Sequence, residues 1–292
     1  MSRPQKLLVA TDFSEHARVA EDAAIALAAR FGAELHWVHA LEVPLPIFEP
    51  YAVAVPEVTL GAARKAAQEK LAEAAARAEA QGVHGTLHLG EVPAAYAVAD
   101  RAQELQADLV VIGTHGHRGI RRMLLGSVAE NTVKLAPCSV LTVKGKEVSV
   151  PPKRMIVAID FSDESRQALA VASELSTEFG ASICLVHAVE IQVPYVTPYE
   201  VVLPDGVLES ARGQAAEQLK ALRAGLPSGV EVTTSVRNGP AHLALVEAAE
   251  SEGADLILTG SRGLTGLKHA LLGSVAERTV RTAPCSVWIV RG

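Results

Sequence analysis

Gly113-Thr-His-Gly-His-Arg-Gly-Ile-Arg-Arg-Met-Leu-Leu-Gly-Ser127 is the stretch that decides the fold, and its glycines follow the spacing G-x2-G-x9-G-S. The same spacing returns in Gly260-Ser-Arg-Gly-Leu-Thr-Gly-Leu-Lys-His-Ala-Leu-Leu-Gly-Ser274. Each copy follows an apolar run typical of a buried strand and precedes a helical pattern. Glycine can adopt φ > 0 and let a ligand approach the backbone, and the first N–H groups of a helix point at an anion. The two stretches therefore predict two phosphate-binding loops, with Ser127 and Ser274 as N-caps.

These loops differ from two common phosphate loops. No Gly-Lys-Ser/Thr ends either copy, and neither has the spacing G-x-G-x-x-G, so the sequence predicts neither a lysine-bearing P-loop nor a dinucleotide fingerprint. A glycine-rich turn that only joins a strand to a helix is the alternative. The second copy, at the same place in the other half of the chain, weakens that alternative.

The chain is a tandem repeat. Lys6-Leu-Leu-Val-Ala-Thr-Asp-Phe-Ser14 matches Arg154-Met-Ile-Val-Ala-Ile-Asp-Phe-Ser162, and residues 113–145 share 19 identities in 33 positions with residues 260–292. Self-similarity on this scale indicates a duplicated domain. We expect domains at residues 1–146 and 153–292, joined by a short linker.

Each repeat alternates strands and helices. The patterns predict strands at 7–11, 34–41, 83–89, 107–112 and 139–144 and helices at 14–31, 57–81, 93–105 and 127–136, and the second repeat follows the same course. Prolines at 44, 46, 50 and 56 predict a long irregular loop.

Such alternation predicts an α/β fold with two tandem open parallel five-stranded sheets and helices on both faces. With the strand order 3-2-1-4-5, ligands lie where the winding direction switches, between strands one and four. Asp12 would then face the Gly113 loop across one crevice, and Asp160 would face the Gly260 loop.

Composition excludes several classes of protein. The chain has 292 residues, 49% hydrophobic and 21% charged, which describes an ordinary globular protein. A net charge of −6 argues against a nucleic-acid surface, and no apolar run approaches the ~20 residues of a membrane span. Three cysteines make no disulfide framework, and the N-terminus shows no secretory signal. We expect a cytoplasmic protein.

Ala10-Thr-Asp-Phe-Ser14, the long-spaced glycine loop and Ala136-Pro-Cys-Ser-Val140 together resemble the universal stress protein family in its tandem two-domain form. The resemblance implies an adenine nucleotide α-hydrolase-like sheet and two domains paired as an intrachain pseudo-dimer. It also implies binding of ATP or a related adenine nucleotide, because family members with this glycine motif are the ones that bind it. Carried over by position, the implied contacts are Ala10, Asp12, Leu41, Gly113, Gly116, Gly126, Ser127 and Val128, and in the second repeat Ala158, Asp160, Val189, Gly260, Gly263, Gly273, Ser274 and Val275.

The aspartates belong near the base or ribose. A carboxylate would repel a triphosphate, so Asp12 either hydrogen-bonds the other end of the nucleotide, which we favour, or holds a divalent cation. Asp12 and Asp160 acting only as helix caps remains the alternative. His39 and His187 recur at a strand end, either at the mouth of the crevice or as structural hydrogen-bonding residues. Charged side chains near the loops either neutralise phosphate or are simply solvated: His115, His117, Arg118, Arg121, Arg122, Arg262, Lys268 and His269.

The function predicted first is a stress-response sensor or regulator that binds ATP, ADP or AMP, with or without Mg²⁺. No catalytic residue and no protein metal site is predicted, and any ATP hydrolysis is expected to be slow. The first alternative is an interaction module that assembles through its last strands with the glycine loops unoccupied. An α/β enzyme of a related nucleotide-hydrolase or flavoprotein type is a weaker third. Protein partners and further pairing of chains stay open.

Overall fold

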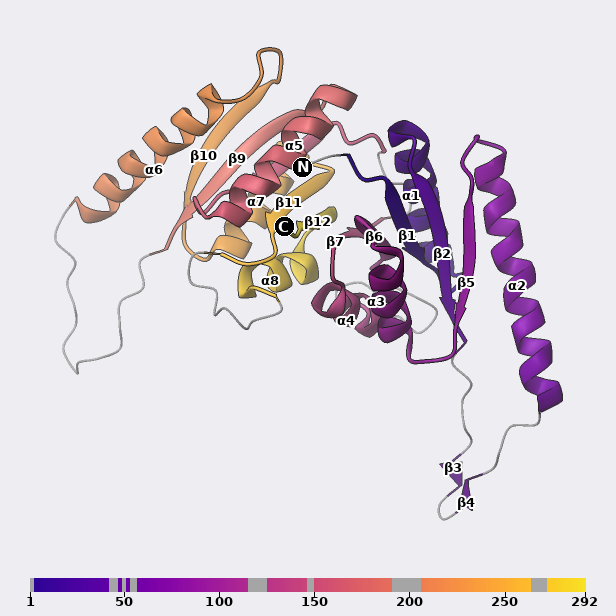
Figure 1. Ribbon diagram of the computed structural model, residues 1–292. Coiled ribbons are helices and arrows are strands. Elements are labelled where there is room, and N and C mark those ends of the chain that lie inside the picture. Colours follow the sequence, from indigo (N-terminus) through magenta and orange to yellow (C-terminus); the bar gives the residue numbers. More distant parts are fainter. Residues whose placement is uncertain are drawn as a thin grey trace. The chain divides into compact units, whose positions relative to one another are not determined.

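The computed structural model describes residues 3–41, 47–48, 51–52, 57–114, 125–145, 150–190, 206–263 and 272–292 (Figure 1). The chain divides into two compact units, residues 2–150 and residues 151–292. Each unit is an α/β domain with one central sheet. No helix in the described ranges combines the length and the apolar character that a membrane crossing requires.

The first unit is built on a parallel sheet of five strands in the order β5-β2-β1-β6-β7. These strands are β1 (Lys6–Ala10), β2 (Glu34–Ala40), β5 (Gly85–Gly90), β6 (Leu109–Gly113) and β7 (Ser139–Val143). Counted along this sheet, the order is 3-2-1-4-5, the order that we expected. The winding direction therefore changes between β1 and β6, and the carboxyl ends of these two strands are where a ligand is expected.

Helices cover both faces of this sheet (Figure 1). They are α1 (Glu15–Phe31), α2 (Glu57–Glu79), α3 (Ala94–Leu105) and α4 (Ser127–Leu135). α1 and α2 contact each other on one face, and α3 contacts α4 on the other. β6 and β7 are buried along their whole length, whereas β5 keeps exposed residues.

The second unit repeats the arrangement, with the parallel order β10-β9-β8-β11-β12. Its elements are β8 (Arg154–Ala158), α5 (Asp163–Phe179), β9 (Ser182–Val189), α6 (Val207–Ala224), β10 (Val232–Asn238), α7 (Ala241–Glu252), β11 (Leu256–Gly260), α8 (Ser274–Thr282) and β12 (Ser286–Val290). Each unit is therefore an open five-stranded parallel sheet, as predicted. The pairing of the two units as an intrachain pseudo-dimer stays a prediction.

The first helix of each unit begins and ends where the sequence predicted. The Ser14 hydroxyl accepts a hydrogen bond from the Ala17 amide at 3.1 Å, which satisfies one of the free donors of the first turn. Gly32 ends the helix in the left-handed region at φ 66°, where glycine carries no Cβ penalty. Ser162 and Gly180 do the same for α5.

One prediction about the first unit was wrong in part. The proline-rich stretch after β2 was expected to be irregular throughout, but β3 (Ile47–Phe48) and β4 (Tyr51–Ala52) form a short antiparallel pair. Aromatic and β-branched residues favour strand pairing, and Pro46 and Pro50 flank the paired positions without occupying them. The rest of that stretch, and the corresponding prolines of the second unit, lie outside the described residues.

Candidate functional site

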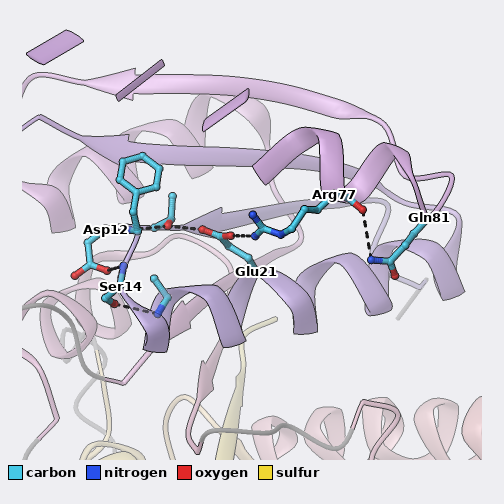
Figure 2. Close-up of polar contacts among 8 residues, drawn as sticks. Asp12, Ser14, Glu21, Arg77 and Gln81 are labelled. Atoms are coloured by element: carbon cyan, nitrogen blue, oxygen red, sulfur yellow. Dashed lines mark hydrogen bonds and ion pairs between the residues drawn. The ribbon is translucent and has the colours of Figure 1, made fainter. Parts of the chain in front are cut away.

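The turn after β1 is shaped by Asp12 and Ser14 (Figure 2). Asp12 Oδ1 accepts a hydrogen bond from the Ser14 amide at 3.0 Å, and Ser14 is itself the N-cap of α1. In the second unit, Asp160 Oδ1 accepts from the Ser162 amide at 3.0 Å and from its hydroxyl at 2.5 Å. The aspartates therefore shape the turn that leads into each helix, whereas the serines cap the helix.

A phenylalanine follows each aspartate in an uncommon backbone conformation. Phe13 has φ 63° and Phe161 has φ 67°, the left-handed region that bulky side chains rarely adopt. Each ring packs on a histidine, with ring centroids 4.4 Å apart for Phe13–His39 and 4.7 Å apart for Phe161–His187. The two phenylalanines were not predicted as site residues. A bulky residue between Asp and Ser at a strand end gives no sign of its backbone conformation in the sequence.

The histidines are structural hydrogen-bond donors. His39 Nδ1 lies 2.8 Å from the carbonyl oxygen of Thr11, and His187 Nδ1 lies 2.7 Å from that of Ile159. A carbonyl only accepts, so Nδ1 carries the hydrogen in both rings. Of the two roles left open for these histidines, the structural one is the one observed, and it holds the backbone just before each aspartate.

The first glycine of each loop makes room for a helix. A Cβ atom on Gly113 would lie 3.0 Å from the carbonyl oxygen of His16, in the first turn of α1. A Cβ atom on Gly260 would lie 2.8 Å from Glu164 Cβ, in the first turn of α5. Close approach of backbone to backbone therefore explains both glycines. The expected positive φ was wrong for these two, and also for Gly126, Gly263 and Gly273.

The last glycine of each loop is the N-cap of the following helix. Gly126 is extended at φ −64° and ψ 145°, and its carbonyl accepts from the Glu130 amide at 2.9 Å. Gly273 has the same role for α8. Ser127 and Ser274 are therefore the first helical residues, and their assignment as N-caps was wrong by one position. Because a glycine N-cap brings no side-chain acceptor, it leaves the first-turn amides of each helix for another acceptor.

The glycine loop and the aspartate converge in the second unit. A Cβ atom on Gly263 would lie only 2.5 Å from Asp160 Oδ2. The loop after β11 thus runs directly past the carboxylate after β8, across the predicted crevice. In the first unit the equivalent Gly116 lies outside the described residues.

The remaining predicted contacts lie at or next to the ends of strands, or in the first turns of helices. Ala10 and Ala158 end β1 and β8. The Leu41 amide donates to the Gly90 carbonyl at 2.8 Å, and the Val189 carbonyl accepts from the Gly239 amide at 3.1 Å, so these backbone groups are already engaged within the protein. The last two predicted contacts, Val128 and Val275, are exposed in the first turns of α4 and α8.

Few of the predicted charged residues lie in the described part of the chain. Arg262 Nε lies 3.7 Å from Glu164 Oε1, and both side chains are partly exposed. The other charged side chains named for the loops lie outside the described residues. In the ranges that are described, no cluster of three or more histidine, cysteine, aspartate or glutamate side chains could hold a metal ion.

A buried polar network under the first crevice was also missed. Glu21 accepts from the Thr11 hydroxyl and pairs with Arg77 of α2 (Figure 2). A signal for it was present, because Glu21 stands four residues after Ala17, on the apolar stripe of its helix, where the second repeat has Leu169.

Comparison with known proteins identifies the family. The model of the universal stress protein family matches residues 4–144 and again residues 152–291. Universal stress protein MJ0531 of Methanocaldococcus jannaschii is 33% identical over 144 residues, which are 48% of this chain and 82% of that protein. Universal stress protein YxiE of Bacillus subtilis is 36% identical over 146 residues, 47% of this chain and 98% of that protein.

A crystal structure supports the fold. A universal stress protein from Archaeoglobus fulgidus DSM 4304 superposes with a TM-score of 0.70 at 21% identity, covering 98% of both chains. The two matches to the family model span nearly the whole chain, one for each α/β unit. The chain therefore belongs to the universal stress protein family and carries two tandem domains of it.

Proposed function

We propose that each domain binds an adenine nucleotide, ATP, ADP or AMP, in the crevice between its first and fourth strands. The chain would act as a cytoplasmic stress-response sensor or regulator that changes its protein contacts with the bound state. Membership of the universal stress protein family supports the stress role. ATP hydrolysis, if it occurs, is expected below ~1 s⁻¹, the lower end of the usual enzyme range.

The observation that carries the proposal is the approach of Gly263 to Asp160. A side chain at Gly263 would collide with the carboxylate, with 2.5 Å between Cβ and Oδ2. Aspartate, glycine loop and helix start therefore border one crevice at the point where the sheet changes winding direction. In open α/β sheets that point is the usual place for a ligand.

Two kinds of group come together at this place, and they suit the two ends of a nucleotide. At the end of each glycine loop, the first-turn amides of α4 and α8 follow glycine N-caps, and such amides together with the helix dipole favour a phosphate. The Asp12 and Asp160 carboxylates, just after β1 and β8, would repel phosphate and accept hydrogen bonds from an amino group or a hydroxyl. We therefore place the base or ribose at the aspartates.

Titration calorimetry of the full chain with ATP, ADP and AMP tests the proposal, with and without Mg²⁺. We expect binding at two sites, and Asp12→Ala or Asp160→Ala should each weaken one of them. Asp108→Ala is the matched control, because Asp108 accepts hydrogen bonds from the Gln5 and Lys6 amides at the amino-terminal ends of the strands, away from the proposed site. It should cost stability and leave nucleotide affinity unchanged.

The outcome separates the proposal from its alternatives. Native mass spectrometry of freshly purified protein should also find a co-purified adenine nucleotide. A folded chain that gives no heat with any of the three nucleotides and carries none from the cell would instead support a nucleotide-independent interaction module of the same fold. If the Asp12 and Asp160 variants lose about 1 kcal/mol of stability with unchanged affinity, the carboxylates act only in the turn.

A further inference from the structure

Glu21 is a buried carboxylate beneath the crevice of the first domain. Its side chain is 3% exposed and lies in the second turn of α1. Oε1 accepts from the Thr11 hydroxyl at 2.5 Å, and Oε2 accepts from Arg77 Nη2 (Figure 2). A buried charge needs such partners, and one of them comes from α2.

The same carboxylate reaches the turn that carries Asp12. Thr11 Oγ1, which donates to Glu21, also accepts from the Phe13 amide at 3.0 Å. Phe13 is the residue held at φ 63°. The peptide group between Asp12 and Phe13 is thus fixed by a series of hydrogen bonds that ends at Arg77.

Helix α2 also contacts this turn directly. Lys70 Nζ lies 5.3 Å from the centroid of the Phe13 ring, which is cation–π geometry. Lys70 and Arg77 are seven residues apart and so share one face of α2. Both contacts from α2 converge on the residue next to Asp12.

The second domain forms the same turn without this network. The positions of Thr11 and Glu21 are occupied by Ile159 and Leu169, which are buried and cannot make these hydrogen bonds. Gln218 and Gly225 stand 148 residues after Lys70 and Arg77, and neither side chain can replace a cation. Phe161 nevertheless has φ 67°. The fold of the turn therefore does not require the network, and apolar substitutes for buried ion pairs are commonly neutral or stabilising.

We propose that Glu21 is a positioning residue that couples α2 to the nucleotide site of the first domain, an inference that rests on the proposed function. When α2 is seated, Arg77 and Lys70 hold the Asp12–Phe13 peptide in the binding geometry. When α2 shifts, that peptide relaxes and the nucleotide binds less tightly. The site of the second domain has no such dependence on α6, so one chain carries a conditional site and an unconditional one.

A pair of substitutions at Thr11 separates hydrogen bonding from packing. Thr11→Val removes the hydroxyl and keeps the shape, whereas Thr11→Ser keeps the hydroxyl and removes a methyl group. Ile159→Val is the matched control in the second domain. Binding of ATP to the full chain is followed by hydrogen exchange in peptides spanning residues 6–31 and residues 154–179, which report the two sites separately.

We expect Thr11→Val to raise the half-saturating ATP concentration of the first site about fivefold or more, the lower range of typical coupling between sites. Thr11→Ser and Ile159→Val should leave both sites near their wild-type values. Equal effects of Thr11→Val and Thr11→Ser on the first site would overturn the proposal, since they would assign Thr11 a packing role only.

A double-mutant cycle tests the link to α2. Arg77→Ala should weaken the first site in the wild-type background. It should have no further effect in Thr11→Ile/Glu21→Leu, which copies the apolar pair of the second domain. An equal effect of Arg77→Ala in both backgrounds would show that Arg77 acts by another route and would overturn the coupling.

A measurement without nucleotide keeps this inference distinct from the proposed function. In the absence of ATP, Arg77→Ala and Thr11→Val should both speed hydrogen exchange at the Phe13 amide. An unchanged rate in Arg77→Ala overturns the coupling even if ATP binds. Absence of ATP-dependent protection in both wild-type domains would instead overturn the proposed function and, with it, the conditional site.

Discussion

The two domains share a backbone design and differ in the core beneath it. Both have the aspartate turn, the left-handed phenylalanine and the histidine that donates to a carbonyl. Under the turn, the first domain buries Thr11 and Glu21, whereas the second buries Ile159 and Leu169. The shared features are therefore those that shape the turn after the first strand of each domain. The space below that turn can be filled by a charged network or by hydrocarbon side chains.

A second pair of positions shows the same contrast. His36 Nδ1 and His88 Nε2 lie 3.1 Å apart on β2 and β5, and Cys184 and Ser235 occupy the equivalent positions on β9 and β10. The first domain thus has ionisable side chains at Glu21, His36 and His88. The second domain has Leu169, Cys184 and Ser235 at those positions. Stability of the first domain should respond to substitution and pH in ways that the second does not.

The two tryptophans allow the domains to be followed separately. Trp37 is fully buried in β2, and Trp288 is 3% exposed in β12; the chain has no other tryptophan. In a Trp288→Phe background, fluorescence reports unfolding of the first domain, and in a Trp37→Phe background it reports the second. Each prediction below compares urea unfolding in these two backgrounds.

The largest effect is expected from Arg77→Ala. It leaves the Glu21 carboxylate buried without its cation and should destabilise the first domain by about 2–4 kcal/mol, less than for a fully buried pair because the Arg77 side chain is 29% exposed. Thr11→Ile/Glu21→Leu/Arg77→Ala should recover most of that loss. A loss below about 1 kcal/mol for Arg77→Ala would mean that solvent screens the pair.

Gly260→Ala should come next and should affect the second domain. The new methyl group would meet the backbone of Glu164, with 2.9 Å between Cβ and the carbonyl carbon, at an overpacking cost of about 1–3 kcal/mol. Gly113→Ala should act on the first domain less strongly, because its nearest contact is 3.0 Å. Gly61→Ala and Gly213→Ala, in helices with open space at Cβ, are the controls and should stabilise by about 0.5–1 kcal/mol.

Acid should destabilise the first domain through the histidine pair. Burial, followed by the charge of Arg101 and then His36, lowers the pKa of His88 to about 4, and burial also lowers the pKa of His36 despite Glu34. The folded state therefore binds fewer protons than the unfolded state between pH 6.5 and about 4. Stability falls as pH decreases through that window, by about 1–2 kcal/mol after allowance for partial exposure.

The control for this pH dependence is His88→Gln, which should reduce the loss of stability of the first domain between pH 6.5 and about 4. The second domain has Ser235 at the equivalent position, so its stability should not fall with pH through protonation of a side chain there. An acid loss of the same size in His88→Gln would assign the effect to other groups.

The smallest effect is expected from loss of the N-cap of α1 or α5, and it should occur in both domains. Ser14→Ala and Ser162→Ala each remove an N-cap acceptor and should cost about 1 kcal/mol in their own domain. Ser162 also donates to Asp160 at 2.5 Å, so its loss should be somewhat greater. A Ser14 variant that destabilises more than the Ser162 variant would contradict the bonding observed in the two turns.

Much of the fold follows from local patterns in the sequence. Helix starts at Ser14 and Ser162, helix ends at Gly32 and Gly180, and the alternation of strands and helices are local signals. The alternation predicts a parallel sheet in each domain. The internal repeat adds independent support, since each helix and each strand of the five-stranded sheet in the first domain has a counterpart in the second. These features depend on short-range backbone hydrogen bonding and on the spacing of apolar residues, and both leave a pattern in one sequence.

The site was less predictable because its decisive contacts link distant residues. The roles of Gly113 and Gly260 depend on contacts with His16 and Glu164, in helices that begin about 100 residues earlier. Their close packing against helix backbone could therefore not be deduced from the loops alone. Glu21 and Arg77 are 56 residues apart. A position-by-position comparison of the repeats, with Glu21 aligned to Leu169, was the one available clue to the network.

Gly113 and Gly260 pack closely against a neighbouring helix, and this packing gives the first glycine of the motif a structural meaning. In relatives, an alanine at that place would report an altered helix docking and would be a poor guide to whether a nucleotide is held. Under the proposed function, the later glycine beside the aspartate, Gly263 here, is the position expected to separate relatives that bind a nucleotide from those that do not, because a side chain there would fill the space in front of the carboxylate.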